Sequence, residues 1–243
     1  MKVAIMQPYF FPYIGYFQLI AASNVFVLHD DVQYIKGGWI NRNRILLNGE
    51  SRMITFPVQK GGYDLPINAR SYVEDKQAPK DIINLIKQAY AKAPRYQHIF
   101  PLIEELLMFE DRNVARFNEN LIRRIADYIG LNCKIITSSG MEKDNSLAGE
   151  ARVLEICKRL GATHYTNPQG GQALYDTATF RAAGIDLRFL VMRPQPYAQR
   201  SPGFMPFLSI IDVLMELGAS GIQPYLSEYD LVTTPSGAKR LSA

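Results

Sequence analysis

Cysteine is scarce in this chain. Its 243 residues include only two, Cys133 and Cys157, which excludes both a disulfide framework and a cysteine-rich zinc site. No apolar run reaches the roughly 18 residues that a membrane-spanning helix requires. The N-terminal segment MKVAIMQPYF also lacks the apolar core of a signal peptide. We therefore expect a cytoplasmic protein with no membrane span.

A strong charge excess is lacking as well. The chain has 27 Lys and Arg against 23 Asp and Glu, for a net charge of +4, which is small for a nucleic-acid-binding surface. Its one local basic cluster is Lys36, Arg42 and Arg44 around Trp39. Two interpretations of this cluster stay open: a solvated loop, or a loop that binds a small anion.

Short apolar segments alternate with segments of helical periodicity at both ends of the chain. Strands are expected at 2–6, 25–29, 133–137, 163–166 and 185–191, and helices at 15–22, 146–160, 176–183 and 208–217. Because strand–helix–strand units are parallel and right-handed, the pattern predicts an open, mostly parallel, Rossmann-like α/β sheet. Ser209 and Asp212 have the spacing of a capping box. Residues 223–243 lose this periodicity and are expected to form a C-terminal tail.

Two insertions interrupt this pattern. Residues 36–75 contain Asn48-Gly49 between two short strand-like segments, which predicts a β-hairpin insertion that covers a site. Residues 79–130 carry three apolar stripes at helical spacing, which predicts a three-helix insertion. We expect residues 1–222, with both insertions, to form one α/β domain.

The expected fold indicates where a ligand would bind, even before any sequence motif is considered. In an open parallel sheet, ligands bind beyond the carboxyl ends of the strands, near the point where strand order reverses. The expected loops at that edge are 7–16, 29–31, 138–140, 167–172 and 193–197. All of them are rich in polar, glycine or tyrosine residues, whereas the strands before them are apolar.

The first of these loops resembles the HIGH-type signature of nucleotidylyl-transfer enzymes. Pro12-Tyr13-Ile14-Gly15-Tyr16 opens a short helix after a strand, where glycine lets a nucleotide approach and the helix N-terminus holds phosphate. Both histidine places are tyrosines, Tyr13 and Tyr16. A tyrosine has a pKa of about 10 and is neutral at pH 7, so the spacing supports the fold but puts adenylyl transfer in doubt. Aromatic packing at a helix start explains the residues equally well.

His29-Asp30-Asp31 gives the best catalytic candidates. A carboxylate beside a histidine raises its pKa and orients it as a general acid or base. Strand alternation places His29 and Asp31 on one face and Asp30 on the other. The two aspartates are also a candidate site for Mg²⁺ bridging a diphosphate, and the simpler alternative is an Asp that caps the following turn.

Three strings of residues together resemble the WbqC-like family of bacterial proteins: MQPYFFPYIGYFQLI, DDVQYIKGGWINRNRI and FMPFLSIIDVLMELG. The resemblance extends to about residue 220 and implies an association with O-antigen and other surface-polysaccharide (lipopolysaccharide) gene clusters, without transferring catalytic residues. Two groups of residues are candidates for ligand binding: positions that match the family pattern, and the glycine-rich turn at 167–172, whose backbone N–H groups can bind an anion. The candidate ligand-binding residues are Gln7, Tyr9, Tyr13, Gly15, Tyr16, Lys36, Trp39, Arg42, Asn43, Arg44, Asn167, Gln169, Gly170, Gly171 and Tyr175.

These observations lead to one hypothesis on function. We expect a transferase that modifies a nucleotide-activated amino sugar during surface-polysaccharide synthesis, by acyl or aminoacyl transfer. In it, Lys36, Arg42 and Arg44 close over the diphosphate and Trp39 stacks on the base or sugar. His29, with a neighbouring aspartate, moves the proton. The partner is a small molecule, and no nucleic acid is involved.

Two alternatives stay open. One is an ATP-dependent nucleotidylyl transferase or ligase, with Mg²⁺ as its cofactor on Asp30 and Asp31. The other is a sugar-nucleotide-binding protein without catalytic activity. Binding without turnover would distinguish the second alternative from both enzymes.

Overall fold

A computed structural model describes residues 1–62 and 64–233, and its centre is a six-stranded sheet. The strands are β1 Lys2–Met6, β2 Val25–Leu28, β5 Lys134–Thr137, β6 His164–Pro168, β7 Asp186–Met192 and β8 Tyr229–Val232. Their order is β5-β2-β1-β6-β7-β8, with the first five parallel and β8 antiparallel to β7. The prediction of an α/β fold with a mostly parallel sheet is therefore confirmed. Strand order reverses between β1 and β6.

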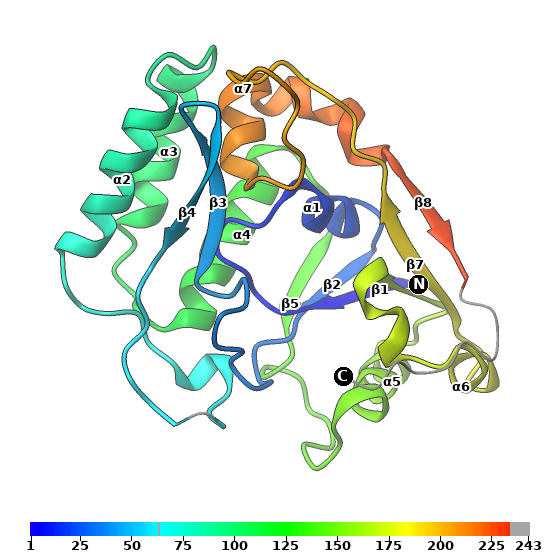
Figure 1. Cartoon of the computed structure of the whole chain (residues 1–243). Coiled ribbons are helices and arrows are strands. Elements are labelled where there is room, and N and C mark those ends of the chain that lie inside the picture. Colours follow the sequence, from blue (N-terminus) through cyan, green and yellow to red (C-terminus); the bar gives the residue numbers. More distant parts are fainter. Residues whose placement is uncertain (63, 234–243) are drawn as a thin grey trace.

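Helices cover both faces of this sheet (Figure 1). They are α1 Ile14–Ala21, α2 Gln77–Tyr90, α3 Tyr96–Leu107, α4 Val114–Tyr128, α5 Gly149–Arg159, α6 Thr177–Ala182 and α7 Ile210–Ile222. Successive side chains of a strand point to opposite faces, so in β1 Ala4 packs in the core with α1, α4 and α7. Val3 and Ile5 pack in a second core with α5 and α6. No helix within the described ranges is long and apolar enough to cross a bilayer.

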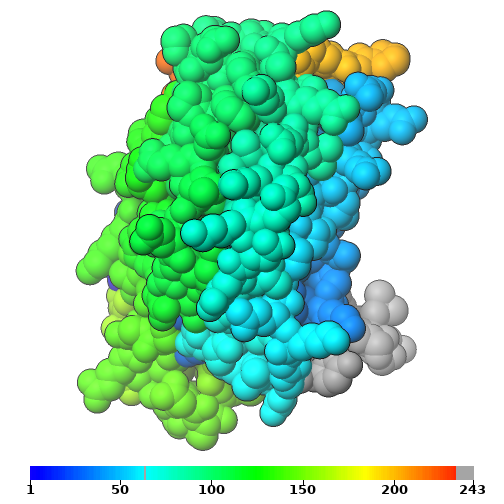
Figure 2. Space-filling view, turned by 90° about the vertical axis from the view of Figure 1, so that its left-hand side faces the viewer, coloured from blue at the N-terminus to red at the C-terminus, as the bar shows by residue number. Residues whose placement is uncertain are grey.

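Both insertions form as expected. Strands β3, Arg42–Leu47, and β4, Glu50–Thr55, pair in an antiparallel hairpin. Asn48 and Gly49 both have positive φ angles, 53° and 81°, as a two-residue hairpin turn requires. The hairpin lies between the main sheet and helices α2 and α3 (Figure 1). Helices α2 to α4 form most of the face seen in Figure 2.

The expected C-terminal tail is wrong for its first ten residues. Residues Gln223–Ser227 form a 3₁₀ helix, and β8 follows it as the edge strand of the main sheet. The buried Gln18 side chain holds this segment, because its Nε2 donates hydrogen bonds to the carbonyl oxygens of Tyr225 and Glu228 at 2.7 and 3.1 Å. Residues 234–243 of the expected tail lie outside the described residues.

Candidate functional site

The loop that follows β2 places two buried polar atoms side by side. Nε2 of His29 lies 3.8 Å from Oδ1 of Asp31, and the two side chains are 13% and 14% exposed. Both atoms are buried, and neither has a hydrogen-bond partner. A distance of 3.8 Å is too long for a hydrogen bond between them, so the hydrogen-bonding capacity of both atoms is unused.

Two cations that we did not predict complete this group. Nζ of Lys143 lies 2.7 Å from Oδ2 of Asp31, and the lysine side chain is only 1% exposed. Nη1 of Arg152 donates to the backbone oxygen of Asp31 at 3.1 Å and lies 3.9 Å from its Oδ1. Lys143 comes from the loop after β5 and Arg152 from α5. We call His29, Asp31, Lys143 and Arg152 the polar cluster.

The expected rise in the pKa of His29 is wrong. Burial disfavours the imidazolium and lowers the pKa of His29 to about 4. The negative charge of Asp31 acts in the opposite direction, but Arg152 and Lys143 offset it. Burial also acts to raise the pKa of Asp31, yet the hydrogen bond and charge of Lys143, together with the Ser138 hydroxyl, lower it overall. At pH 7 the cluster therefore holds a neutral imidazole beside an ionised carboxylate.

Asp30 points away from this pair. Its Oδ1 accepts a hydrogen bond from the backbone N–H of Ser139 at 2.9 Å, and its Oδ2 accepts one from the Ser139 hydroxyl. Both carboxylate oxygens of Asp30 are thus engaged by Ser139, and Lys143 contacts Oδ2 of Asp31. In the part of the chain that the structure describes, no three His, Cys, Asp or Glu side chains gather as a metal site. Asp30 instead joins the end of β2 to the loop after β5.

Two substitutions in the polar cluster should move the pKa of His29 in opposite directions. Lys143→Met removes a cation that lowers this pKa, so the pKa should rise, whereas Asp31→Asn removes an anion that raises it, so the pKa should fall further. An NMR titration of the imidazole resonances measures both, because the chain has only three histidines and the other two are exposed. Shifts of the same sign in both variants would contradict this electrostatic account.

An aromatic cavity of about 260 Å³ opens beyond β1. It is lined by Tyr9, Pro12, Tyr13, Trp39, Asn43, Arg44 and Phe207. The Arg44 guanidinium lies 5.5 Å from the centre of the Trp39 ring, and its buried Nε has no hydrogen-bond partner. Phe207 is half-exposed and has a positive φ of 60°, a strained backbone for this residue type. The cavity thus combines apolar rings with one unsatisfied cationic donor.

Tyr13 changes the interpretation of the HIGH-like helix start. A Cβ placed on Gly15 would lie 2.3 Å from the Tyr13 ring, so the glycine admits this ring instead of a nucleotide phosphate. Tyr16 is fully buried, and its hydroxyl donates to the carbonyl oxygen of Gln7 at 3.0 Å. Burial raises the pKa of Tyr13 and of Tyr16, and it raises that of Tyr9 to about 12. All three phenols are neutral hydrogen-bonding groups at pH 7.

The basic residues of the hairpin do not converge as expected. Lys36 and Arg42 line a separate groove, together with Lys60 and Arg70. Asn43 has a structural role, because its Nδ2 donates to the carbonyl oxygens of Phe10 and Phe11 at 3.2 and 2.7 Å. Of the predicted diphosphate clamp, only Arg44 faces the cavity that contains Trp39.

The glycine-rich turn after β6 is built around packing. A Cβ on Gly171 would lie 1.9 Å from Oδ1 of Asn167, and Nδ2 of Asn167 donates to the Tyr165 hydroxyl at 2.6 Å. The Tyr175 ring packs edge-on against Tyr165. Gln169 and Gly170 are exposed. Close packing against Asn167 explains the glycine at 171 without a ligand.

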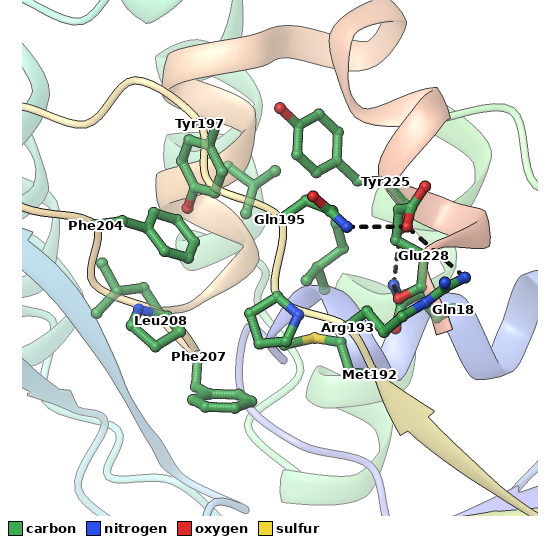
Figure 3. A pocket seen from close by; sticks show the side chains of 14 residues that line it. Gln18, Met192, Arg193, Gln195, Tyr197, Phe204, Phe207, Leu208, Tyr225 and Glu228 are labelled. Atoms are coloured by element: carbon green, nitrogen blue, oxygen red, sulfur yellow. Dashed lines mark hydrogen bonds and ion pairs between the residues drawn. The ribbon is translucent and has the colours of Figure 1, made fainter. Parts of the chain in front are cut away.

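The loop after β7 borders a small cleft with α1 (Figure 3). Nε2 of Gln195 donates to a Glu228 carboxylate oxygen at 3.2 Å, and Nη2 of Arg193 lies 3.9 Å from the same atom. The cleft has a volume of about 30 Å³, which is enough for one or two water molecules. Phe207 borders both this cleft and the aromatic cavity, so the loop after β7 helps to shape the cavity wall.

Comparison with known proteins identifies the family. The model of the WbqC-like protein family matches residues 7–224. The chain belongs to the WbqC-like family. A relative named "Uncharacterized protein Rv1507c", from Mycobacterium tuberculosis, is 29% identical over 221 residues, which cover 90% of this chain and 94% of the relative. No solved structure matches the chain.

Proposed function

We propose that this WbqC-like protein is a transferase that acylates or aminoacylates the amine of a nucleotide-activated sugar in surface-polysaccharide synthesis. The observation that carries the proposal is the pair of buried polar atoms without hydrogen-bond partners, Nε2 of His29 and Oδ1 of Asp31, 3.8 Å apart. A primary amine has several N–H donors and can serve both atoms when the ring hydrogen of His29 is on Nδ1. The family resemblance supports the polysaccharide setting.

The polar cluster suits proton removal from such an amine. When the amine nitrogen bonds to the carbonyl carbon of an acyl donor, that nitrogen becomes acidic. Its proton passes to Nε2 of His29, the bond between the carbonyl carbon and the leaving group breaks, and the proton then passes to the leaving group. The Asp31 carboxylate stabilises the transient imidazolium, and Lys143 holds that carboxylate in place at 2.7 Å. Neutral His29 is free to accept at pH 7.

The aromatic cavity provides binding for the nucleotide-sugar. Its volume of about 260 Å³ is at the low end for ligand pockets and suits one ring of the ligand. A sugar or base ring would stack on Trp39, and the unsatisfied Nε of Arg44 would donate to a phosphate oxygen. The polar cluster and this cavity follow the carboxyl ends of adjacent strands, β2 and β1. This is the edge where open α/β sheets bind ligands.

Ligand selectivity tests the proposal. UDP-, dTDP- and GDP-linked amino sugars should raise the melting temperature more than the same nucleotides linked to sugars without an amine. Arg44→Gln should weaken binding of both classes about tenfold, because a charge-assisted hydrogen bond is lost. Asp31→Asn should remove the preference for the amine. Arg52→Gln, on the same hairpin but outside the cavity, is the matched control and should bind normally.

The outcomes separate the candidate functions. With acyl-CoA as the acyl donor, a transferase increases the mass of the amino-sugar nucleotide, and His29→Gln should slow this about 100-fold or more. Nucleotide-sugar binding without any turnover would favour the non-catalytic binding protein. No stabilisation by any nucleotide-sugar would contradict the proposal.

A further inference from the structure

A groove of about 580 Å³ lies beside the hairpin, separate from the aromatic cavity. We propose that this basic groove binds a small ligand carrying a phosphate or diphosphate group. Its lining includes four cationic side chains, Lys36, Arg42, Lys60 and Arg70, and no carboxylate among the residues that the structure describes. The volume is within the range of pockets for small molecules.

The floor of the groove holds a buried cation. Arg70 is only 9% exposed, and its guanidinium donates to the carbonyl oxygens of Gly62 and Gln59 at 3.0 and 2.7 Å. The two carbonyl oxygens accept hydrogen bonds from the guanidinium but do not neutralise its charge. Among the described residues, no carboxylate lies within ion-pair distance of Arg70. A buried charge without a counter-charge is costly, and an anionic ligand would supply that charge.

The loops around Arg70 are shaped to leave it facing the groove. A Cβ on Gly61 would lie 2.6 Å from Nη1 of Arg70, so glycine is required for the guanidinium to lie there. The centre of the Tyr34 ring lies 5.1 Å from the same guanidinium, within the range of a cation–π contact. Nε of Arg42 donates to the carbonyl oxygen of Gly38 at 3.0 Å, which orients a second guanidinium at the same groove. A groove whose charged side chains are all positive attracts anions and raises their local concentration.

A phosphate-type ligand suits this arrangement better than a long polyanion. Arginine guanidinium groups and backbone N–H groups of glycine loops are the usual donors to phosphate oxygens. The cations converge on a concave groove instead of extending along a face, which favours a compact anion over nucleic acid. This inference rests on the groove alone and does not depend on the reaction proposed above.

Calorimetric titration of the full chain with inorganic phosphate and pyrophosphate tests the groove. Pyrophosphate should bind, and Arg42→Gln should weaken its binding at least about tenfold. Lys60→Gln, an exposed position whose substitution should leave the fold intact, should also weaken it measurably. Tighter binding of pyrophosphate than of phosphate would assign a diphosphate, and equal binding a single phosphate group.

Two control variants distinguish pyrophosphate binding in the groove from nucleotide-sugar binding in the aromatic cavity. Arg52→Gln removes a hairpin cation outside the groove and should leave pyrophosphate affinity unchanged. Arg44→Gln should weaken the binding of nucleotide-sugars in the aromatic cavity, whereas pyrophosphate should still bind in the groove. Absence of pyrophosphate binding, or equal affinity in wild type, Arg42→Gln and Lys60→Gln, would overturn the inference. Binding of an RNA oligonucleotide without pyrophosphate binding would overturn it too.

Discussion

Between pH 6.5 and pH 4, the wild-type protein should lose about 3 kcal/mol of unfolding free energy that a His29→Gln variant does not lose. The pKa of His29 is about 4 in the folded protein, against 6.5 for an ordinary histidine. The unfolded chain therefore binds a proton through this whole window while the folded protein does not. Protons then favour the unfolded state, so stability falls as pH falls and the loss is complete below about pH 4.

Urea unfolding at pH 7 and pH 4.5 measures this difference. Most ionisable groups titrate alike in wild type and variant, so their contributions cancel when the two unfolding free energies are subtracted. Asp31 does not interfere, because its pKa lies below its usual 3.8 and it stays ionised through the window. His98→Gln is the matched control, since His98 is exposed and its variant should follow wild type. Parallel pH dependence in wild type and His29→Gln would show that His29 titrates normally.

The same residue shows where sequence reasoning stops. The sequence pattern placed His29 and Asp31 on one face, and their side chains do lie 3.8 Å apart. Strand alternation is not the cause, because β2 ends at Leu28 and both residues lie in the loop that follows. The pattern also could not show that Lys143 reaches Asp31 from the segment after β5. Burial and distant counter-charges decide the pKa of His29, and both are set by tertiary structure.

The hairpin and the edge strand show a similar limit. Asn48-Gly49 predicted the hairpin because the turn itself selects these residues. Arg42 and Arg44 are two residues apart on β3, yet they line different hollows, which the residue spacing did not reveal. Strand β8 was missed because its four residues are too few for a clear periodicity. The fold was therefore largely predictable, whereas the contacts that define each candidate site were not.

Asp212 shows a further departure from the sequence pattern. Its spacing from Ser209 predicts a capping box, and Ser209 does cap α7, because its Oγ accepts a hydrogen bond from the N–H of Ile211. Asp212 turns inward and is 0% exposed. Its Oδ1 accepts from the Tyr90 hydroxyl at 2.8 Å, and its Oδ2 accepts from the Tyr197 hydroxyl at 2.6 Å and from Gln199 at 2.9 Å. Three separate donors thus depend on one carboxylate.

This network connects elements that are far apart in the sequence. Tyr90 ends α2, and its hydroxyl oxygen accepts a hydrogen bond from the backbone N–H of Leu46 in β3 at 3.0 Å. Tyr197 and Gln199 belong to the segment after β7. Asp212 on α7 therefore fixes the hairpin, the helical insertion and the segment after β7 to one another. Because β3 also carries Arg44, the network supports one wall of the aromatic cavity.

Asp212→Ala should therefore lower the unfolding free energy by about 3 kcal/mol, since it leaves the Tyr90 and Tyr197 hydroxyls without their carboxylate acceptor, whereas Gln199 can still donate to the carbonyl oxygen of Met205. Tyr90→Phe removes one of these bonds and the acceptor of the Leu46 N–H, and it should cost about 1–2 kcal/mol. Urea unfolding at pH 7 compares them with Asp127→Asn, an exposed position on α4 that should change stability by less than about 0.5 kcal/mol. A loss below 1 kcal/mol in Asp212→Ala, on the same scale, would mean that water replaces the carboxylate and that the network does not hold these elements together.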